Sequence, residues 1–136
     1  MRRLGENAET GRVGELAALV AERARVEAAG CGDPARHVVH VAIENVSAGY
    51  DIESAWNGET RFIEVKSTRG ESGDFFISEN ERSTLARLGA KSWMYRVQVN
   101  GEGIGTVVEM INDPIHVLGE ASFEPVAWRV KRRLSP

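Results

Sequence analysis

The sequence predicts one mixed α/β domain of 136 residues. An amphipathic helix comes first, and three strand-like segments separated by turn signals follow it. A second helix, marked by a capping motif, then leads into a fourth strand. A helix that connects two strands makes a crossover, and crossovers join parallel strands. The predicted sheet is therefore mixed, and the length fits a single domain over residues 1–136.

Composition excludes several classes of protein. Hydrophobic residues make up 42% and charged residues 27% of the chain, as in ordinary soluble domains. No apolar run approaches the roughly 18 residues of a membrane helix, so we expect no membrane association. The single cysteine, Cys31, rules out an internal disulfide and favours a reducing, cytoplasmic location. The net charge of −3 argues against broad, sequence-independent DNA binding.

The first predicted helix covers residues 8–29, and Gly30 follows as a C-terminal stop. Two glycines, Gly11 and Gly14, lie inside it, although glycine in a helix costs about 1 kcal/mol relative to alanine. Close approach of the helix to a sheet would explain them. The apolar residues at helical spacing predict the buried stripe: Val13, Leu16, Ala17, Val20 and Ala24.

Three segments with strand character follow. The sequences HVVHVAIE (37–44), YDIESAW (50–56) and TRFIEVKST (60–68) are rich in β-branched and aromatic residues. The segment CGDPAR before them reads as a loop, and NGE at 57–59 predicts a tight hairpin turn between the second and third strands. After a glycine-rich loop, FFIS at 75–78 predicts a short strand.

The second half of the chain begins with a helix signal. Ser78 and Glu81 match the capping box, which predicts a helix over residues 79–88 that ends at Gly89. The apolar run SWMYRVQV at 92–99 predicts a strand, Asn100-Gly101 a turn and IGTVVEM at 104–110 the partner strand. The remainder is expected to be irregular with one late strand that includes Trp128. The strands predicted after residue 100 therefore form a short C-terminal β extension of the core.

Charged residues gather on one face of the second and third strands. Glu64 and Lys66 alternate with apolar residues, and so they share a face. Counting from the hairpin turn places Asp51 level with Glu64 or Lys66. Two neighbouring carboxylates are costly unless a cation lies between them, and Mg²⁺ or Mn²⁺ suits such oxygen ligands. A lysine beside them can orient a metal-bound water or stabilise charge on a phosphate.

Two of these interpretations have ordinary structural alternatives. Glu64 and Lys66 can be surface neighbours on a solvated sheet face, and Asp51 can simply begin a strand. Glu15 follows Gly14 and can add a third carboxylate to the cluster, or it can be an acid in the first turns that favours the helix dipole.

Together these residues resemble the PD-(D/E)xK nuclease superfamily. Asp51 stands at the first acid, Glu64-Val65-Lys66 at the E-x-K motif and Glu15 at the helical glutamate. More narrowly, residues 5–99 are similar to the NO VEIN C-terminal domain family in the segments GRVGE, GYDI, IEVKST, FFISENE and YRV. The resemblance implies a restriction endonuclease-like α-β-β-β-α-β core, with a mixed sheet flanked by helices. One departure is Tyr50, which stands where the superfamily name has proline.

The resemblance also implies a function, that of a Mg²⁺-dependent endodeoxyribonuclease. Asp51, Glu64 and the backbone carbonyl of Val65 would bind Mg²⁺, for which Mn²⁺ can substitute, with help from Glu15. Lys66 would position the attacking water. Restriction, phage-defence and helicase systems are the settings and partners implied, and double-strand cutting of DNA would need a homodimer.

A second hypothesis comes from another class of protein. The fold can serve as a catalytically silent nucleic-acid-binding or protein-interaction module, which the acidic net charge favours. The intact acid and lysine set argues against it, because a silent domain has no reason to keep a costly charge cluster. The resemblance also marks Ser78, Asn80 and Glu81. Helix capping explains Ser78 and Glu81, and all three are assigned a structural role.

Overall fold

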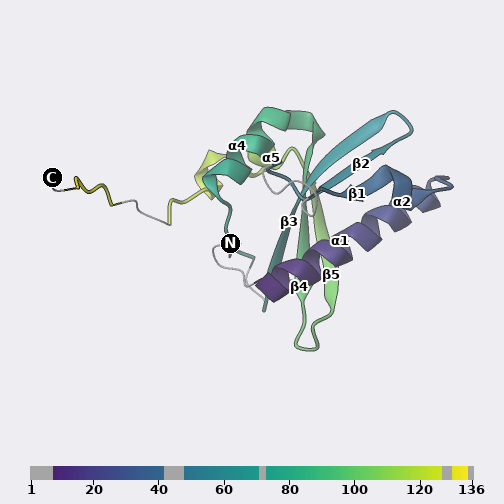
Figure 1. Ribbon diagram of the computed structural model, residues 1–136, viewed down its shortest axis with the longest axis horizontal. Coiled ribbons are helices and arrows are strands. Elements are labelled where there is room, and N and C mark those ends of the chain that lie inside the picture. Colours follow the sequence, from purple (N-terminus) through teal and green to yellow (C-terminus); the bar gives the residue numbers. More distant parts are fainter. Residues whose placement is uncertain (1–7, 42–47, 71–72, 127–129, 135–136) are drawn as a thin grey trace.

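The computed structural model describes residues 8–41, 48–70, 73–126 and 130–134. A five-stranded sheet forms its centre, with α1 across one face and α4 and α5 on the other (Figure 1). The elements in chain order are α1 (Ala8–Ala28), α2 (Pro34–His37), β1 (Val38–His40), β2 (Ile52–Trp56), β3 (Glu59–Arg69), α4 (Glu79–Leu88), η1 (Gly89–Lys91), β4 (Ser92–Val99), β5 (Gly105–Asn112), α5 (Pro114–Leu118) and η2 (Glu120–Ser122).

The sheet has the predicted mixed topology. Its order is β1-β2-β3-β4-β5, and every neighbouring pair is antiparallel except β3 and β4, which are parallel because α4 makes the crossover. The hairpin between β2 and β3 turns through Asn57 and Gly58, whose φ angles of 53° and 81° are those of a type I′ turn. The order α1-β1-β2-β3-α4-β4 confirms the restriction endonuclease-like core, and β5 is the C-terminal β extension.

Each face of the sheet has its own hydrophobic core. The larger core lies under α1 and joins helix residues to alternate residues of β2, β3 and β4: Ala18, Leu19, Val26, Ile52, Ile63, Val65, Tyr95, Val97 and Val99. The smaller core lies under α4 and α5 and contains Leu85, Met94 and Ile111. Because both faces of the sheet are covered, residues 63–67 of β3 are all buried, as is usual for strands in the interior of a two-sided sheet.

The buried side of α1 differs from the predicted stripe. Leu16 is 50% exposed and Val20 is 67% exposed, and Ala24 is exposed as well, so that part of the prediction is wrong. The helix instead presents its smallest residues to the sheet, including Gly11, Gly14 and Ala18. A Cβ on Gly14 would lie 1.6 Å from Ser67 Oγ. Close approach of α1 to β3 therefore selects glycine there, as the in-helix glycines predicted.

Two predicted strands also differ. Residues 75–78 form no strand; Phe75 and Ile77 instead pack against the smaller core, and Ser78 caps α4. The strand predicted over 37–44 is only three residues long in β1, because His37 ends α2, the short helix that Pro34 begins inside the predicted loop. Residues 42–44 of that prediction lie outside the described residues.

The segment after β5 contains a short helix, α5, that periodicity did not indicate. Asp113 and Pro114 open it, and proline is well suited to the first position of a helix. Residues 123–126 and 130–134 form no strand, and Trp128, on which the late-strand prediction depended, lies outside the described residues. Within the described part of the chain, no helix is long and apolar enough to span a membrane.

Candidate active site

Asp51 lies level with Glu64, as the turn predicted. The register of β2 and β3 pairs Ile52 with Ile63, and the Asp51 N–H donates to the Ile63 carbonyl at 2.8 Å. The Asp51 carboxylate then accepts a hydrogen bond from the Val65 N–H at 2.8 Å. The side chain thus occupies the edge of β3 just beyond the last paired residue of β2. This hydrogen bond fixes the carboxylate beside the Glu64-Val65 peptide.

The predicted cluster of Asp51, Glu64 and Lys66 is buried. Asp51 is 4% exposed, Glu64 1% and Lys66 3%. Glu64 and Lys66 lie on the sheet face that α4 covers, because their neighbours Ile63 and Val65 point into the core under α1. The alternative that they are surface neighbours on a solvated face is therefore wrong.

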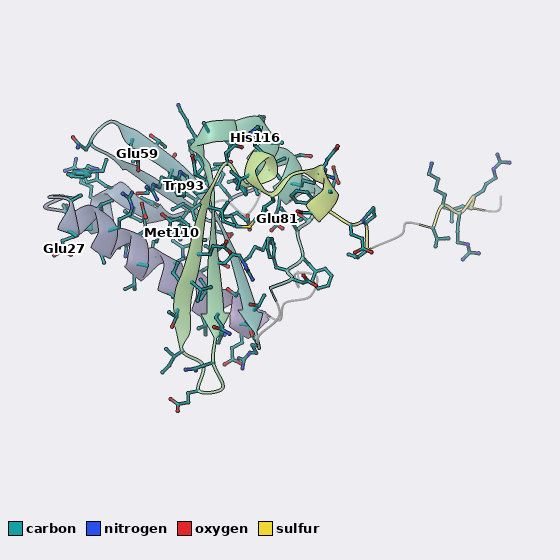
Figure 2. All side chains as sticks on the ribbon, turned by 180° about the vertical axis from the view of Figure 1, so that it is seen from behind. Glu27, Glu59, Glu81, Trp93, Met110 and His116 are labelled. Carbon is teal, nitrogen blue, oxygen red and sulfur yellow. The ribbon has the colours of Figure 1, made fainter. Side chains whose placement is uncertain are left out.

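Glu81 joins the cluster from α4. Lys66 Nζ donates to Glu81 Oε1 at 2.7 Å, and the same oxygen accepts from the Ser78 N–H at 2.9 Å. The capping box is confirmed, since Ser78 Oγ also accepts from the Glu81 N–H at 3.0 Å. Glu81, labelled in Figure 2, therefore both caps the helix and holds Lys66. Sequence reasoning missed the second role because capping already explained the residue.

The electrostatics of the cluster oppose a fully charged state. Burial, followed by the charges of Asp51 and Glu81, raises the pKa of Glu64 well above its usual value, and Lys66 offsets this only in part. Burial also opposes ionisation of Glu81, but the charge of Lys66 and its hydrogen bond lower the pKa of Glu81 below its usual value. Glu64 is therefore harder to ionise than an exposed glutamate, and a nearby cation would oppose this rise in its pKa. Its Oε1 is buried and has no hydrogen-bond partner among the described residues.

The donor set fits a magnesium ion. No three His, Cys, Asp or Glu side chains in the described ranges are arranged to hold a metal, but Mg²⁺ needs only one or two carboxylates and keeps several waters. Asp51 and Glu64 supply two, and the partnerless Oε1 of Glu64 is an acceptor without a donor. The N–H and C=O of one strand residue point to the same edge. Hence the Val65 carbonyl also faces Asp51.

Glu15 lies on α1 and has a different described partner. Its Oε1 lies 2.7 Å from His40 Nε2, and both side chains are 14% exposed. His40 pairs with Ile52, a residue of the core under α1. The structure therefore brings Asp51, Glu64, Lys66 and Glu81 together, and it records Glu15 with His40. A ligand role for Glu15 stays a prediction.

The element order and strand pairing define an α/β protein with a restriction endonuclease-like core. Comparison with known families makes this more specific. The chain belongs to the family described as Protein NO VEIN, C-terminal, whose model matches residues 14–110, well over half of the chain. No curated protein and no solved structure gave a match.

Proposed function

We propose that this protein is a metal-dependent endonuclease that hydrolyses phosphodiester bonds in DNA. One observation supports this above all others: Asp51 and Glu64 are buried side by side next to Lys66, and Glu64 Oε1 lacks a partner among the described residues. A fold that buries two carboxylates together gains stability when a divalent cation binds between them. The pair is therefore better explained as a metal site than as a structural contact.

In the proposed site, Asp51, Glu64 and the Val65 carbonyl would hold Mg²⁺ or Mn²⁺, and the ion would supply Lewis acidity for hydrolysis. Asp51 is kept in place by the Val65 N–H. Lys66 reaches the same face of β3 and donates to the attacking water or to a phosphate oxygen, while Glu81 orients its ammonium group. Glu15 lies with His40 on the α1 side of the sheet, so it would assist only if it left His40 and reached the ion past the edge of β3.

Cleavage assays test this proposal. The substrates are supercoiled plasmid, single strands, branched junctions and modified DNA, each with Mg²⁺ or Mn²⁺. We expect Lys66→Ala to lower the cleavage rate by roughly 10²- to 10⁴-fold, the usual effect of removing a positioned proton donor. Lys91→Ala is the matched control, because Lys91 is exposed at the far end of α4. Equal cleavage by the Lys66→Ala protein would contradict the proposed role of Lys66.

A melting experiment tests the metal site without catalysis. Ligand that binds only the folded state stabilises it by RT ln(1 + [L]/Kd), about 1.4 kcal/mol at ten times Kd. Mg²⁺ should therefore raise the melting temperature of the wild-type protein, and Asp51→Asn should abolish the shift. An equal shift in both proteins would place the ion elsewhere.

The partners follow from the same proposal. Cutting both strands of DNA requires two sites, so we propose a homodimer for that activity, as closed two-fold assemblies are the commonest oligomers. A helicase or defence-system protein is the partner that would deliver DNA to a domain of net charge −3. Sedimentation of the protein with and without DNA distinguishes monomer from dimer.

A catalytically silent nuclease-like module is the second candidate. One observation favours it: Lys66 is already ion-paired to Glu81, and Asp51 and Glu64 are nearly closed to solvent. Such a module would bind DNA or a protein without needing Mg²⁺. DNA binding with neither cleavage nor a metal-dependent melting shift would favour this candidate.

A further inference from the structure

A second cation lies beside Lys66 on the proposed active face. The parallel register of β3 and β4 pairs Lys66 with Arg96, and neighbouring strands lie about 4.8 Å apart. Arg96 follows Met94 by two residues, and Met94 belongs to the core under α4. Arg96 therefore projects from the same face of the sheet as Glu64 and Lys66.

The contacts of Arg96 leave part of its guanidinium available. Its terminal nitrogen donates to Glu109 at 3.0 Å, and its guanidinium carbon lies 5.0 Å from the centre of the Phe75 ring. The Arg96 side chain is 17% exposed and Glu109 is 48% exposed. Arg96 Nε is buried and has no hydrogen-bond partner among the described residues. An exposed acid thus holds the terminal nitrogen of a well-packed arginine, and a competing anion can displace that acid.

The sheet face continues from Arg96 into a hollow. Gln98 is the next residue of β4 on this face, and it pairs with Thr68 on one side and Thr106 on the other. One such step along a strand is about 6.6 Å. A hollow of about 560 Å³ follows, lined by the polar residues Arg69, Gln98 and Thr106 and by apolar residues that include Val99, Ile104 and Val108. The hollow lies at the C-terminal end of β4, and α4 packs near Met94 at the other end of the strand.

We propose that Arg96 binds a phosphate of the DNA strand. This phosphate neighbours the scissile phosphate, which lies at Asp51, Glu64 and Lys66. This inference rests on the proposed function. In the absence of DNA, the Glu109 carboxylate occupies the position of that phosphate. The planar fork of an arginine binds phosphate through two parallel hydrogen bonds. The terminal nitrogen of Arg96 that donates to Glu109 is one of the donors of that fork. From Arg96 the bound DNA strand would continue over Gln98 and Thr106 to the hollow.

Charge complementarity selects this occupant. The face carries the acids Asp51, Glu64, Glu81 and Glu109, and Lys66 and Arg96 are each held by one of them. Metal binding would neutralise Asp51 and Glu64 and leave Lys66 and Arg96 as adjacent donors. Glu81 and Glu109 then balance Lys66 and Arg96, and a phosphate that displaces the exposed carboxylate of Glu109 would lie beside two cationic side chains. Arg96 is a substrate-binding residue in this scheme.

Binding of a short fluorescein-labelled single-stranded oligodeoxynucleotide tests the inference. Anisotropy is measured with Mg²⁺ in a Lys66→Ala background, so that cleavage does not consume the probe. We expect Arg96→Gln to weaken binding roughly tenfold, as loss of a charged hydrogen bond does. The salt dependence of log K should fall by about one unit in slope. Glu109→Gln should tighten binding about threefold, because it removes the competing carboxylate.

Arg82→Gln is the matched control. Arg82 also pairs with an acid, Glu120 at 4.0 Å, and stacks on an aromatic ring, Phe123 at 4.7 Å, but it belongs to α4. Its loss should leave affinity unchanged. Arg96→Lys keeps the charge without the fork and should bind with intermediate affinity. Melting curves establish that each variant is folded before its affinity is compared.

The outcomes separate this inference from the proposed function. If Arg96→Gln weakens binding while the wild-type protein cuts nothing, the phosphate site stands and the nuclease proposal fails. If the wild-type protein cuts DNA and Arg96→Gln changes neither affinity nor KM, the nuclease stands and the phosphate site is overturned. Equal losses in Arg82→Gln and Arg96→Gln, or no binding by the parent protein, also overturn it.

Discussion

Gly14→Ala should destabilise the protein even though it improves helix propensity. Alanine gains about 1 kcal/mol over glycine inside a helix. The added Cβ, however, would lie 1.6 Å from Ser67 Oγ and 2.8 Å from Ser67 Cβ. A new rotamer of Ser67 can remove the first contact, but only movement of α1 or β3 removes the second. Overpacking of this kind costs roughly 1–3 kcal/mol, and the severity of the contact places it near the upper end.

The net destabilisation is therefore about 2 kcal/mol, which lowers the melting temperature by about 8 °C for a domain of this size. Thermal and urea unfolding of the variant measure it. Gly101→Ala is the control, because no atom lies within 4 Å of its added Cβ, and it should change stability by less than about 0.5 kcal/mol. Ser67→Ala combined with Gly14→Ala should recover part of the loss. A Gly14→Ala protein more stable than the wild type would refute the close packing of α1 on β3.

Two further predictions concern stability. Burial opposes ionisation of Glu22, but hydrogen bonds from Arg25, Ser54 and Tyr95 outweigh it and lower the pKa of Glu22 below 4.5. The stability that ionised Glu22 contributes is therefore complete above about pH 4.5, and it is lost as the pH falls through the pKa of Glu22 in the folded protein. Glu22→Gln should thus cost about 3 kcal/mol at neutral pH, and a difference in melting temperature from wild type that fails to shrink below pH 4.5 would contradict this. Ser78→Ala should cost about 1 kcal/mol by urea unfolding through loss of the α4 cap. An equal cost for Ser83→Ala, at an exposed position of α4, would argue against capping.

Local signals in the sequence predicted the elements whose causes are local. The capping box and Gly89 give the observed bounds of α4, and the type I′ turn at Asn57 and Gly58 fixes the register that brings Asp51 level with Glu64. Each of these signals depends on residues within a few positions of one another. The turn thus predicted that Asp51 lies level with Glu64 or Lys66, and the register of the structure selects Glu64.

The errors arose where a distant contact decides the outcome. Hydrophobic periodicity placed Leu16 and Val20 inside, whereas contact with β3 selects the small residues of α1. Hydrophobic periodicity depends on apolar side chains, and so it cannot detect a glycine that lets a helix approach a strand because it has no side chain. Glu81 illustrates the same limit, because its pairing with Lys66 joins residues 15 positions apart through the crossover. Its local role in the capping box was sufficient to explain it.

Both helices hold the strand that carries the site. Ser67 of β3 packs against Gly14 of α1 on one face, and Lys66, the residue before it, pairs with Glu81 of α4 on the other. Residues 63–67 are buried as a result, and their side chains have little freedom to leave the cluster. A site held by rigid elements on both sides keeps its geometry without a ligand. The G-x-x-G-E helix and the capped helix are thus parts of the candidate site, because each fixes one residue of the strand that bears Glu64.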